Sequence, residues 1–418
     1  MHTIENTSAL HDIKVLVRVD FNVPLKGEEI RDNNRIVAAL PTINYLLGKN
    51  NAVVLMSHLG KIKWGKVDDA EIANEKAKNN MEFVYPELKK LLAGHTVKFC
   101  AATHGDELKA AIAGLKLGEV LLVQNTRYEK GESKNDATLS KEWASYVDGF
   151  VMDAFGSAHR AHASTYGVPE VLKAEGKPVA LGFLMEKEVK NLTTCVAPTD
   201  KDHPYIAILG GFKVSDKIKV IESLLKKCDK ILIGGAMTYT FKKALGMSIG
   251  TSPVEEDQLD YAKKCYDTGK IVLPVDCICA NTFDYDPAVT KILTVDTVPG
   301  NEIGGASVNG IPDGFEGLDV GPETVALFDA EIAKARLIFW NGPVGVFEKE
   351  QYQTGTKAIC KAITANKLAF SVIGGGDSAA AAKEFGYADK FSHVSTGGGA
   401  SLEMIENDGH LPGIDVIG

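Results

Sequence analysis

The segment from Asp153 to Ser164, DAFGSAHRAHAS, gathers histidine, arginine and aspartate side chains that suit ligand binding or proton transfer. His159 and His162 are three positions apart, so they could form a metal site, an acid/base pair or part of an anion site. No third metal ligand stands out beside them, and the positive charge of Arg160 between them opposes a cation. The metal site is the weakest interpretation, and an acid/base pair requires a reaction that moves a proton.

Further charged and polar residues occur in the first half of the chain, most of them just after apolar runs that predict strands. They are Arg18, Asp20, Asn22, Arg35, His58, Lys61 and Arg127. In an open parallel sheet, ligands bind beyond the carboxyl ends of the strands. We therefore expect these side chains to gather around a small, dense polyanion.

In the second half, the predicted strands run into glycine instead. The glycine pairs and triplets are Gly210–Gly211, Gly234–Gly235, Gly374–Gly376 and Gly397–Gly399. Glycine lets the backbone approach a ligand closely, and the N–H groups at a helix N-terminus bind phosphate. The second half therefore predicts a phosphate site built from backbone.

Two lysines follow the first of these glycine turns, in the segment GGFKVSDK. Lys213 and Lys217 are four positions apart, so we expect them to share one helix face and neutralise phosphate oxygens. A solvated lysine face is the equally weighted alternative. The segment is not a Walker A loop, because GxxxxGK[ST] occurs nowhere in the chain.

The segment IGGGDSAAAAKEFG allows two interpretations. Gly374, Gly376 and Ala379 satisfy GxGxxA, which would indicate a dinucleotide site and a dehydrogenase. Against this, the Asp377 carboxylate would repel a pyrophosphate, and about 20 residues on no acid is available for a ribose. A divalent cation between Asp377 and phosphate removes the repulsion, since Mg²⁺ combines few carboxylates with phosphate oxygens. A helix N-cap is the structural alternative for Asp377.

Three more segments suit a nucleoside. Glu348, in WNGPVGVFE, could hold the hydroxyls of a ribose, although a surface glutamate is the plain alternative. The segments ILIGGAMTYTF and FEGLDVGPET offer apolar and glycine surface for a purine ring.

Short apolar strands must position these residues, and they alternate with helix-length amphipathic segments. The expected strands are 13–21, 52–58, 96–101, 119–125, 149–155, 205–211, 230–236, 271–276, 337–342, 368–376 and 392–399. Near-continuous apolar strands of this kind predict parallel sheets covered on both faces. We expect an α/β protein with two doubly wound, Rossmann-like domains, joined by a hinge helix within 181–204.

Composition excludes several classes of protein. The 418 residues carry a net charge of −9, which argues against a nucleic-acid binder. The seven cysteines form no CxxC pair, which favours a reducing, cytoplasmic location. We expect no signal peptide and no membrane span, because no apolar run approaches the ~20 residues that a bilayer requires.

Eight segments occur in a specific order: RVDFNVP, SHLGK, DAFGSAHRAHAS, GFLMEKE, GGFKVSDK, WNGPVGVFE, GGGDSA and STGGGASLE. Each is a weak signal alone, but the ordered set closely resembles the phosphoglycerate kinase family, from about Val15 onward. The resemblance implies reversible in-line transfer of the acyl phosphate of 1,3-bisphosphoglycerate to MgADP, giving 3-phosphoglycerate and MgATP, by a cytoplasmic, monomeric enzyme of glycolysis and gluconeogenesis. Such a phosphotransferase has a carboxyl group as acceptor and needs no general base, so the resemblance makes His159 and Arg160 anion-binding and His162 structural.

The resemblance also implies domain roles. They are a substrate domain at 1–184, an interdomain helix and hinge at 185–203, a Mg-nucleotide domain at 204–400 and a tail at 401–418 that returns to the first domain. Both substrates together are expected to close the hinge.

Site residues carry over position by position. The implied substrate contacts are Asp20, Phe21, Asn22, Arg35, His58, Leu59, Gly60, Lys61, Arg127, His159 and Arg160. The implied nucleotide contacts are Gly211, Lys213, Lys217, Gly235, Gly317, Leu318, Asn341, Glu348, Gly375, Gly376, Asp377 and Ser378. Asp377 would carry Mg²⁺ through the nucleotide, while Arg35, Lys213, Gly397, Gly398 and Gly399 would face the transferring phosphoryl group as catalytic residues.

The chain departs from the family pattern after SHLG, where arginine is usual and Lys61 stands here. Lysine keeps the charge but loses the two-pronged guanidinium, so we expect weaker substrate binding rather than loss of activity. The following loop also differs, and the sequence gives it no role.

Overall fold

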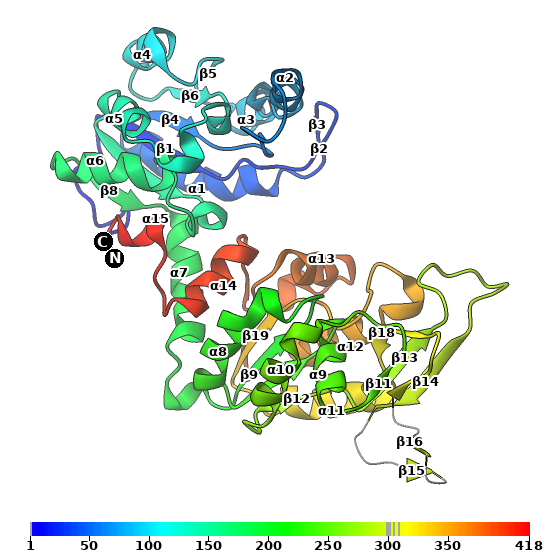
Figure 1. The fold of residues 1–418 in the computed structure, drawn as a ribbon. Coiled ribbons are helices and arrows are strands. Elements are labelled where there is room, and N and C mark those ends of the chain that lie inside the picture. Colours follow the sequence, from blue (N-terminus) through cyan, green and yellow to red (C-terminus); the bar gives the residue numbers. More distant parts are fainter. Residues whose placement is uncertain (1, 298–301, 304–305, 308–309) are drawn as a thin grey trace. The chain divides into compact units, whose positions relative to one another are not determined.

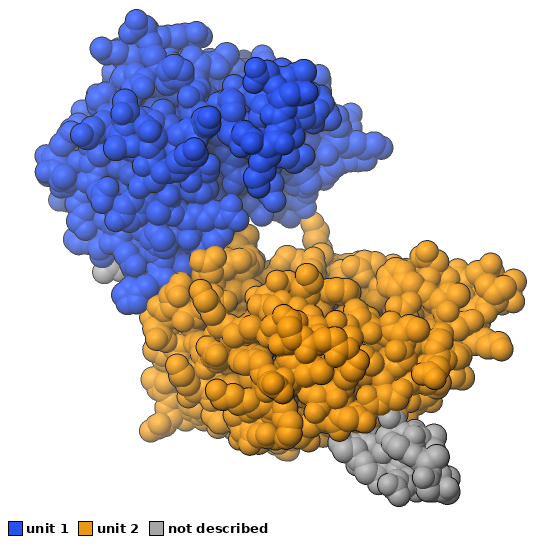
Figure 2. All heavy atoms as spheres, viewed as in Figure 1, with its two compact units in different colours: residues 1–190, 410–418 blue, residues 191–409 orange. Residues whose placement is uncertain are grey.

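The computed structural model describes residues 2–297, 302–303, 306–307 and 310–418, and the chain divides into two compact units. Unit 1 contains residues 1–190 and 410–418, and unit 2 contains residues 191–409 (Figure 2). The boundary falls inside helix α7 (Phe183–Val196), so one helix continues from unit 1 into unit 2. Each unit has its own sheet and its own buried apolar core.

Unit 1 is built on a six-stranded parallel sheet in the order β5-β6-β4-β1-β7-β8 (Figure 1). The strands are β1 (Lys14–Val19), β4 (Ala52–Met56), β5 (Val97–Cys100), β6 (Val120–Val123), β7 (Gly149–Asp153) and β8 (Val179–Leu181). The other elements are the hairpin β2 (Leu25–Lys26) and β3 (Glu29–Ile30), and helices α1 (Asn34–Gly48), α2 (Asp69–Lys78), α3 (Tyr85–Leu91), α4 (Gly105–Ala113), α5 (Ala137–Ser145), α6 (Val168–Ala174) and α15 (Pro412–Asp415). Strands β4, β6 and β7 are buried along their whole length, as expected for strands covered on both faces.

Residues 410–418 of the C-terminal tail belong to unit 1, whereas residues 401–409 of the expected tail belong to unit 2 and include most of α14 (Gly398–Glu406). The backbone N–H of Gly413 donates to the carbonyl of Ala158 at 2.8 Å. The Lys173 ammonium donates to the carbonyls of Val416 and Ile417, and His2 N–H donates to the carbonyl of Gly418. The tail is therefore held directly beside the segment that carries His159 and Arg160.

Unit 2 has a parallel sheet in the order β12-β10-β9-β19-β20-β21. Its strands are β9 (Tyr205–Leu209), β10 (Lys230–Ile233), β12 (Ile271–Val272), β19 (Leu337–Asn341), β20 (Phe370–Ile373) and β21 (His393–Val394). Its helices are α8 (Ile218–Lys227), α9 (Met237–Ala244), α10 (Leu259–Tyr266), α11 (Pro322–Ile332), α12 (Thr354–Ala365), α13 (Gly376–Glu384) and α14 (Gly398–Glu406).

Unit 2 also has an antiparallel sheet that the sequence analysis missed, in the order β14-β13-β18. It consists of β13 (Asp276–Ala280), β14 (Ile292–Asp296) and β18 (Glu316–Val320), and smaller pairs are β11 (Ser248–Ile249) with β17 (Gly310–Ile311) and β15 (Glu302–Ile303) with β16 (Ala306–Ser307). The strand expected at 271–276 is wrong in extent: β12 ends at Val272, before Pro274, and Asp276 already belongs to the other sheet. Proline cannot donate to a sheet ladder, which explains the break.

All seven cysteines are buried free thiols. Among the described residues, no helix is both long and apolar enough to cross a membrane.

Candidate active site

A cavity of about 480 Å³ in unit 1 is lined mainly by cations. The cationic side chains are Lys61, Lys63, Lys66, Arg127, Lys130, Lys134 and Arg160, and Glu129 and His162 also line the cavity. The structure thus brings together three of the predicted substrate residues, Lys61, Arg127 and Arg160. Such a concentration of positive charge in a concave site attracts a polyanion.

Arg127 lies in the short 3₁₀ turn η2 (Thr126–Tyr128) that follows β6. The Asn125 side chain caps this turn by accepting from Arg127 N–H at 3.1 Å, and the Arg127 guanidinium donates to the Gly60 carbonyl at 2.6 Å. Burial and the neighbouring Arg18 lower the pKa of Arg127 to about 10. The guanidinium therefore stays positively charged at neutral pH.

The three histidines near this cavity are neutral at pH 7. Burial and the Arg160 guanidinium lower the pKa of His159 to about 4, and burial and Arg18 lower that of His162 to about 4. Burial, and then Arg18, lowers the pKa of His58 well below its usual value. Neutral imidazoles can donate N–H groups to an anion but do not add cationic charge to the site.

Arg18 is a core residue, and its expected place in the anion site is wrong. The side chain is 1% exposed and donates to Ser164 Oγ at 2.8 Å and to the Val19 carbonyl at 2.6 Å. Its guanidinium also lies 3.2 Å from His58 Nδ1. Arg18 therefore holds His58 in place from inside the unit.

Most of the other predicted substrate residues follow β1 and β4, whereas Arg35 lies in the first turn of α1 and His159 follows β7. The Arg35 guanidinium lies 2.5 Å from the Asp20 carboxylate, and Gly60 N–H donates to the Asn22 side chain at 2.8 Å. A second cavity of unit 1, about 630 Å³ in volume, is lined in part by Asn22, Leu59 and Gly60. The Phe21 side chain is fully buried in the core, so only its backbone is available to a ligand.

A cavity of about 510 Å³ in unit 2 combines glycine, apolar and acidic groups. Six predicted nucleotide residues line it: Gly211, Gly235, Gly317, Leu318, Glu348 and Asp377. The apolar surface comes from side chains that include Phe212, Tyr239, Phe283, Pro343 and Val344. A planar apolar group with polar groups at its edges fits this lining.

Lys213 and Lys217 do not share one helix face, contrary to the sequence prediction. Helix α8 begins only at Ile218, after a 3₁₀ turn at Ser215–Lys217. The Glu255 carboxylate explains the late start, because it accepts from Val214 N–H at 2.6 Å and so holds this segment outside the helix. Lys213 is exposed, whereas Lys217 is half-buried.

The half-buried Lys217 is held by the end of β19. Its ammonium donates to the side-chain oxygen of Asn341, whose own N–H donates to the Gly374 carbonyl at 2.5 Å. Burial lowers the pKa of Lys217 to about 8. Ser378 lies nearby, fully buried, and its hydroxyl accepts from Gly342 N–H at 2.6 Å.

Two helix N-termini meet beside these residues. Gly375 precedes α13 and Gly397 precedes α14. A Cβ placed on Gly398 would lie 3.0 Å from the backbone nitrogen of Gly376, so the first turns of the two helices are in close contact. The N–H groups in the first turn of a helix and the positive end of its dipole favour an anion, and here two helices offer both at one point.

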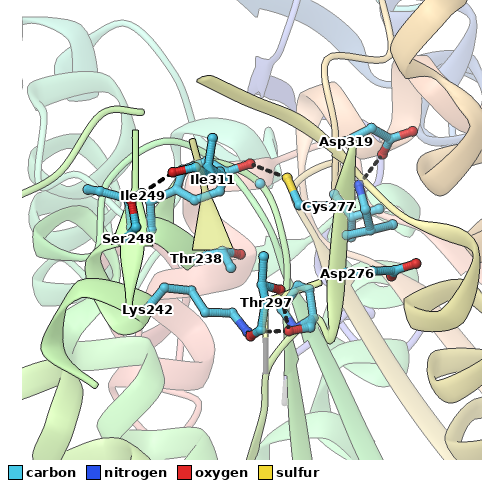
Figure 3. A pocket seen from close by; sticks show the side chains of 14 residues that line it. Thr238, Lys242, Ser248, Ile249, Asp276, Cys277, Thr297, Ile311 and Asp319 are labelled. Carbon is cyan, nitrogen blue, oxygen red and sulfur yellow. Dashed lines mark hydrogen bonds between the residues drawn. The ribbon is translucent and has the colours of Figure 1, made fainter. Parts of the chain in front are cut away.

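A small cavity of about 10 Å³ adjoins the 510 Å³ cavity of unit 2 and shares Gly235, Tyr239 and Val344 with it (Figure 3). The Lys242 ammonium points into it and donates to the carbonyls of Pro274 and Thr297. Burial lowers the pKa of Lys242 to about 8. A space of this size holds at most about one water molecule, so these groups support the fold rather than bind a ligand.

Part of each cavity was not predicted from the sequence. In unit 1 no role was predicted for residues 62–66, IKWGK, although Lys63, Trp64 and Lys66 line the basic cavity. Three lysines at such close spacing around one aromatic were the available signal. In unit 2 no role was predicted for Phe283 and Lys349, whose loops are brought together by a hydrogen bond from the Lys349 ammonium to the Phe283 carbonyl at 2.7 Å.

Comparison with known proteins gives consistent results. Residues 4–408 match the family model described as phosphoglycerate kinase. Phosphoglycerate kinases from Fusobacterium nucleatum and Enterococcus faecalis are 50% and 49% identical to the chain, each over 98% of this chain and 97% of the relative. Among solved structures, phosphoglycerate kinase from Coxiella burnetii has a TM-score of 0.82 at 34% identity, covering 99% of this chain and 98% of that one. The enzyme from Pyrococcus horikoshii has a TM-score of 0.79 at 31% identity, covering 100% and 98%.

Proposed function

This chain belongs to the phosphoglycerate kinase family, and we propose that its two units divide the reaction, unit 1 binding the three-carbon acid and unit 2 the nucleotide. The enzyme transfers the acyl phosphate of 1,3-bisphosphoglycerate to ADP, giving 3-phosphoglycerate and ATP, and the reaction is reversible. The observation that carries the division is the contrast between the two cavities. One is strongly cationic, and the other combines apolar walls, glycine and three carboxylates, those of Glu316, Glu348 and Asp377.

In unit 1, Lys61, Arg127 and Arg160 bind the phosphate and carboxyl groups of the acid, with His159 and His58 as neutral donors. The Asp20 carboxylate accepts a hydrogen bond from the hydroxyl group of the acid, and the Asn22 side-chain amide donates one to it. The Arg35 guanidinium, held 2.5 Å from Asp20, faces the transferring phosphoryl group. These assignments rest on the positions of the side chains around the carboxyl ends of β1, β4, β6 and β7.

In unit 2, Gly317 and Leu318 contact the adenine and Glu348 holds the ribose. Lys217 binds nucleotide phosphate, and the first turns of α13 and α14 bind phosphate through backbone N–H groups. Lys213 is exposed at the same edge of the sheet and stabilises the phosphoryl group in flight. Gly397, Gly398 and Gly399 present the backbone N–H groups of α14 to that group.

Asp377 fits a role in holding Mg²⁺ together with the nucleotide. Its carboxylate is exposed, lies in the first turn of α13 and lines the nucleotide cavity. Among the described residues, no three His, Cys, Asp or Glu side chains gather to hold a metal, so phosphate oxygens would complete the shell. When bound, Mg²⁺ neutralises charge on the nucleotide phosphates.

The chemistry requires no general base, because the acceptor oxygen is already anionic near pH 7 in both directions. Catalysis therefore consists of positioning in line and of neutralising the phosphoryl oxygens. Excluding water protects the acyl phosphate from hydrolysis, so closure around both substrates is part of the proposal. Small-angle scattering with both substrates bound should show compaction. The enzyme is further proposed to be monomeric and cytoplasmic.

The test is a coupled assay of the purified chain. 3-Phosphoglycerate, ATP and Mg²⁺ are supplied, and glyceraldehyde-3-phosphate dehydrogenase reports the product through loss of NADH. We expect NADH loss that needs all three components and stops with EDTA. Tight binding of MgADP with no turnover, while the coupling enzyme is active, would contradict the proposed activity.

A further inference from the structure

The loop that follows Gly60 is tied to Arg127 by two hydrogen bonds that run in opposite directions. The indole N–H of Trp64 donates to the backbone carbonyl of Arg127 at 2.9 Å. The guanidinium of Arg127 donates to the carbonyl of Gly60 at 2.6 Å. The position of the Arg127 backbone and the direction of its side chain are therefore both fixed by residues 60–64.

Helix α2 holds the same loop from its other side. The Lys76 ammonium lies 4.8 Å from the ring centroid of Trp64 and 5.2 Å from that of Tyr128, and so it makes a cation–π contact with each ring. The Tyr128 hydroxyl donates to the Lys76 carbonyl. Trp64 and Tyr128, which neighbours Arg127 in η2, are thus clamped around one cation.

A third anchor lies one residue before Trp64. Lys63 N–H donates to the Glu75 carboxylate at 2.6 Å, and the Lys63 ammonium lies 3.2 Å from the other oxygen of the same carboxylate. The Glu75 side chain is only 8% exposed, which limits its motion. The segment Lys61–Lys66 is consequently a fixed wall of the basic cavity.

We propose that Trp64 is a positioning residue of the anion site, which holds Arg127 so that its guanidinium meets the phosphate of the three-carbon acid. This proposal rests on the proposed function. It gives a physical role to the loop beside Lys61. At that position arginine is usual in the family, and lysine lacks its two-pronged guanidinium. A rigidly held Arg127 offsets that loss, since a preorganised guanidinium loses less side-chain freedom when it binds.

The direct test compares Trp64→Phe with the wild type in the full-length enzyme. Phenylalanine keeps a ring in contact with Lys76 but removes the N–H donor. We expect KM for 3-phosphoglycerate to rise about fivefold, which corresponds to about 1 kcal/mol for one lost hydrogen bond. The kcat and the KM for MgATP should stay within about twofold. Equal rises in both KM values, or an unchanged KM for 3-phosphoglycerate, would overturn the proposal.

Two lysine variants separate this role from general stability. Lys76→Met should also raise KM for 3-phosphoglycerate, because it removes the cation between the two rings. Lys89→Ala is the matched control, since the Lys89 ammonium lies 5.9 Å from the ring centroid of Tyr85 in a comparable contact on α3. Similar kinetics for Lys76→Met and Lys89→Ala would contradict the proposal.

Fluorescence gives a readout that does not depend on turnover. Of the three tryptophans, Trp143 and Trp340 are 1% and 0% exposed, whereas Trp64 is half-buried at the cavity. Inorganic phosphate and 3-phosphoglycerate should each change the emission and acrylamide quenching of the wild type, but not of Trp64→Phe. The same change in both proteins would overturn the proposal. An enzyme without activity that still shows the Trp64 response would count against the proposed function alone.

Discussion

The ammonium of Lys217 donates a hydrogen bond to the side-chain oxygen of Asn341, beside the glycine turn at Gly211. Because burial lowers the pKa of Lys217 to about 8, the free enzyme loses this positive charge as the pH rises through that value. Phosphate favours the protonated lysine, so binding above pH 8 should take up a proton. We expect the affinity for MgADP to fall between about pH 8 and 10.

Calorimetry in two buffers of different ionisation enthalpy measures this proton uptake directly. Lys217→Arg is the control, because a guanidinium stays charged over the whole range and should flatten the pH dependence. An affinity for MgADP that does not change between pH 7 and about 9.5 would remove Lys217 from phosphate binding.

Lys213→Ala should lower kcat by at least about 100-fold, because one preorganised donor to a transition state contributes about 2.7–4 kcal/mol. The side chain is exposed, so its removal should leave the melting temperature unchanged. Lys226→Ala, an exposed lysine at the far end of α8, is the matched control in the coupled assay. A loss below tenfold would exclude a catalytic role for Lys213.

Two glycines in unit 2 should respond differently to alanine. At Gly376 an added Cβ meets nothing within 4 Å, so Gly376→Ala should fold normally and disturb only the approach of phosphate to α13. We expect its KM for MgATP to rise about tenfold, as for the loss of a charge-assisted hydrogen bond. Steady-state kinetics beside thermal melting would show this, and unaltered kinetics would refute phosphate contact at Gly376.

At Gly210 the added Cβ would lie 1.9 Å from the carbonyl oxygen of Pro343, a contact with backbone that cannot rotate away. Gly210→Ala should therefore destabilise unit 2 by about 1–3 kcal/mol, as overpacking does elsewhere. Comparing Gly210→Ala with Gly376→Ala distinguishes a glycine that packing requires from a glycine proposed to let phosphate approach the backbone. Equal melting temperatures of the two variants would contradict it.

The parallel sheets could be predicted from the sequence because their strands are apolar along their whole length and end in glycine or charge. β9 shows this, running from Tyr205 to Leu209 before Gly210. β8 was missed because three residues give too short a signal, and the break between β12 and β13 was missed because Pro274 lies inside one apolar run. Strand pairing in the antiparallel sheet β14-β13-β18 depends on contacts between residues that are distant in sequence.

The types of site residue were predictable, but their charge states were not. Arg18 stands at the end of an apolar strand like a ligand-binding cation, yet it points into the core toward Ser164 and lowers the pKa of His58. Such an effect depends on burial, which spacing does not reveal. The hydrogen bond between Trp64 and Arg127 could not be predicted either, because it joins residues 63 positions apart in sequence.

Asp153 should make the stability of unit 1 depend on pH. Its carboxylate is fully buried at the end of β7 and accepts from Leu184 N–H at 3.0 Å and Met185 N–H at 3.4 Å. Burial raises its pKa to about 7. Between about pH 4 and 7 the native state holds a proton that the unfolded state has lost. The free energy of unfolding should therefore fall as the pH rises, by up to about 1.4 kcal/mol per pH unit.

Asp153→Asn tests this dependence, because the amide cannot ionise. Urea unfolding between pH 5 and 8 should give a flatter profile for Asp153→Asn than for the wild type. Parallel profiles for the two proteins would show that another group sets the pH dependence.

Lys61→Arg should strengthen the binding of 3-phosphoglycerate. Lys61 lines the basic cavity with Arg127 and Arg160, and a guanidinium there would bind phosphate through two parallel hydrogen bonds where an ammonium acts as a point charge. We expect KM for 3-phosphoglycerate to fall about fivefold, with kcat and the KM for MgATP unchanged. Lys109→Arg, an exposed lysine on α4 of the same unit, controls for general effects of the exchange. If Lys61→Arg leaves KM for the acid unchanged or raises it, then Lys61 does not contact the substrate phosphate, and the anion would be bound by Arg127 and Arg160 alone.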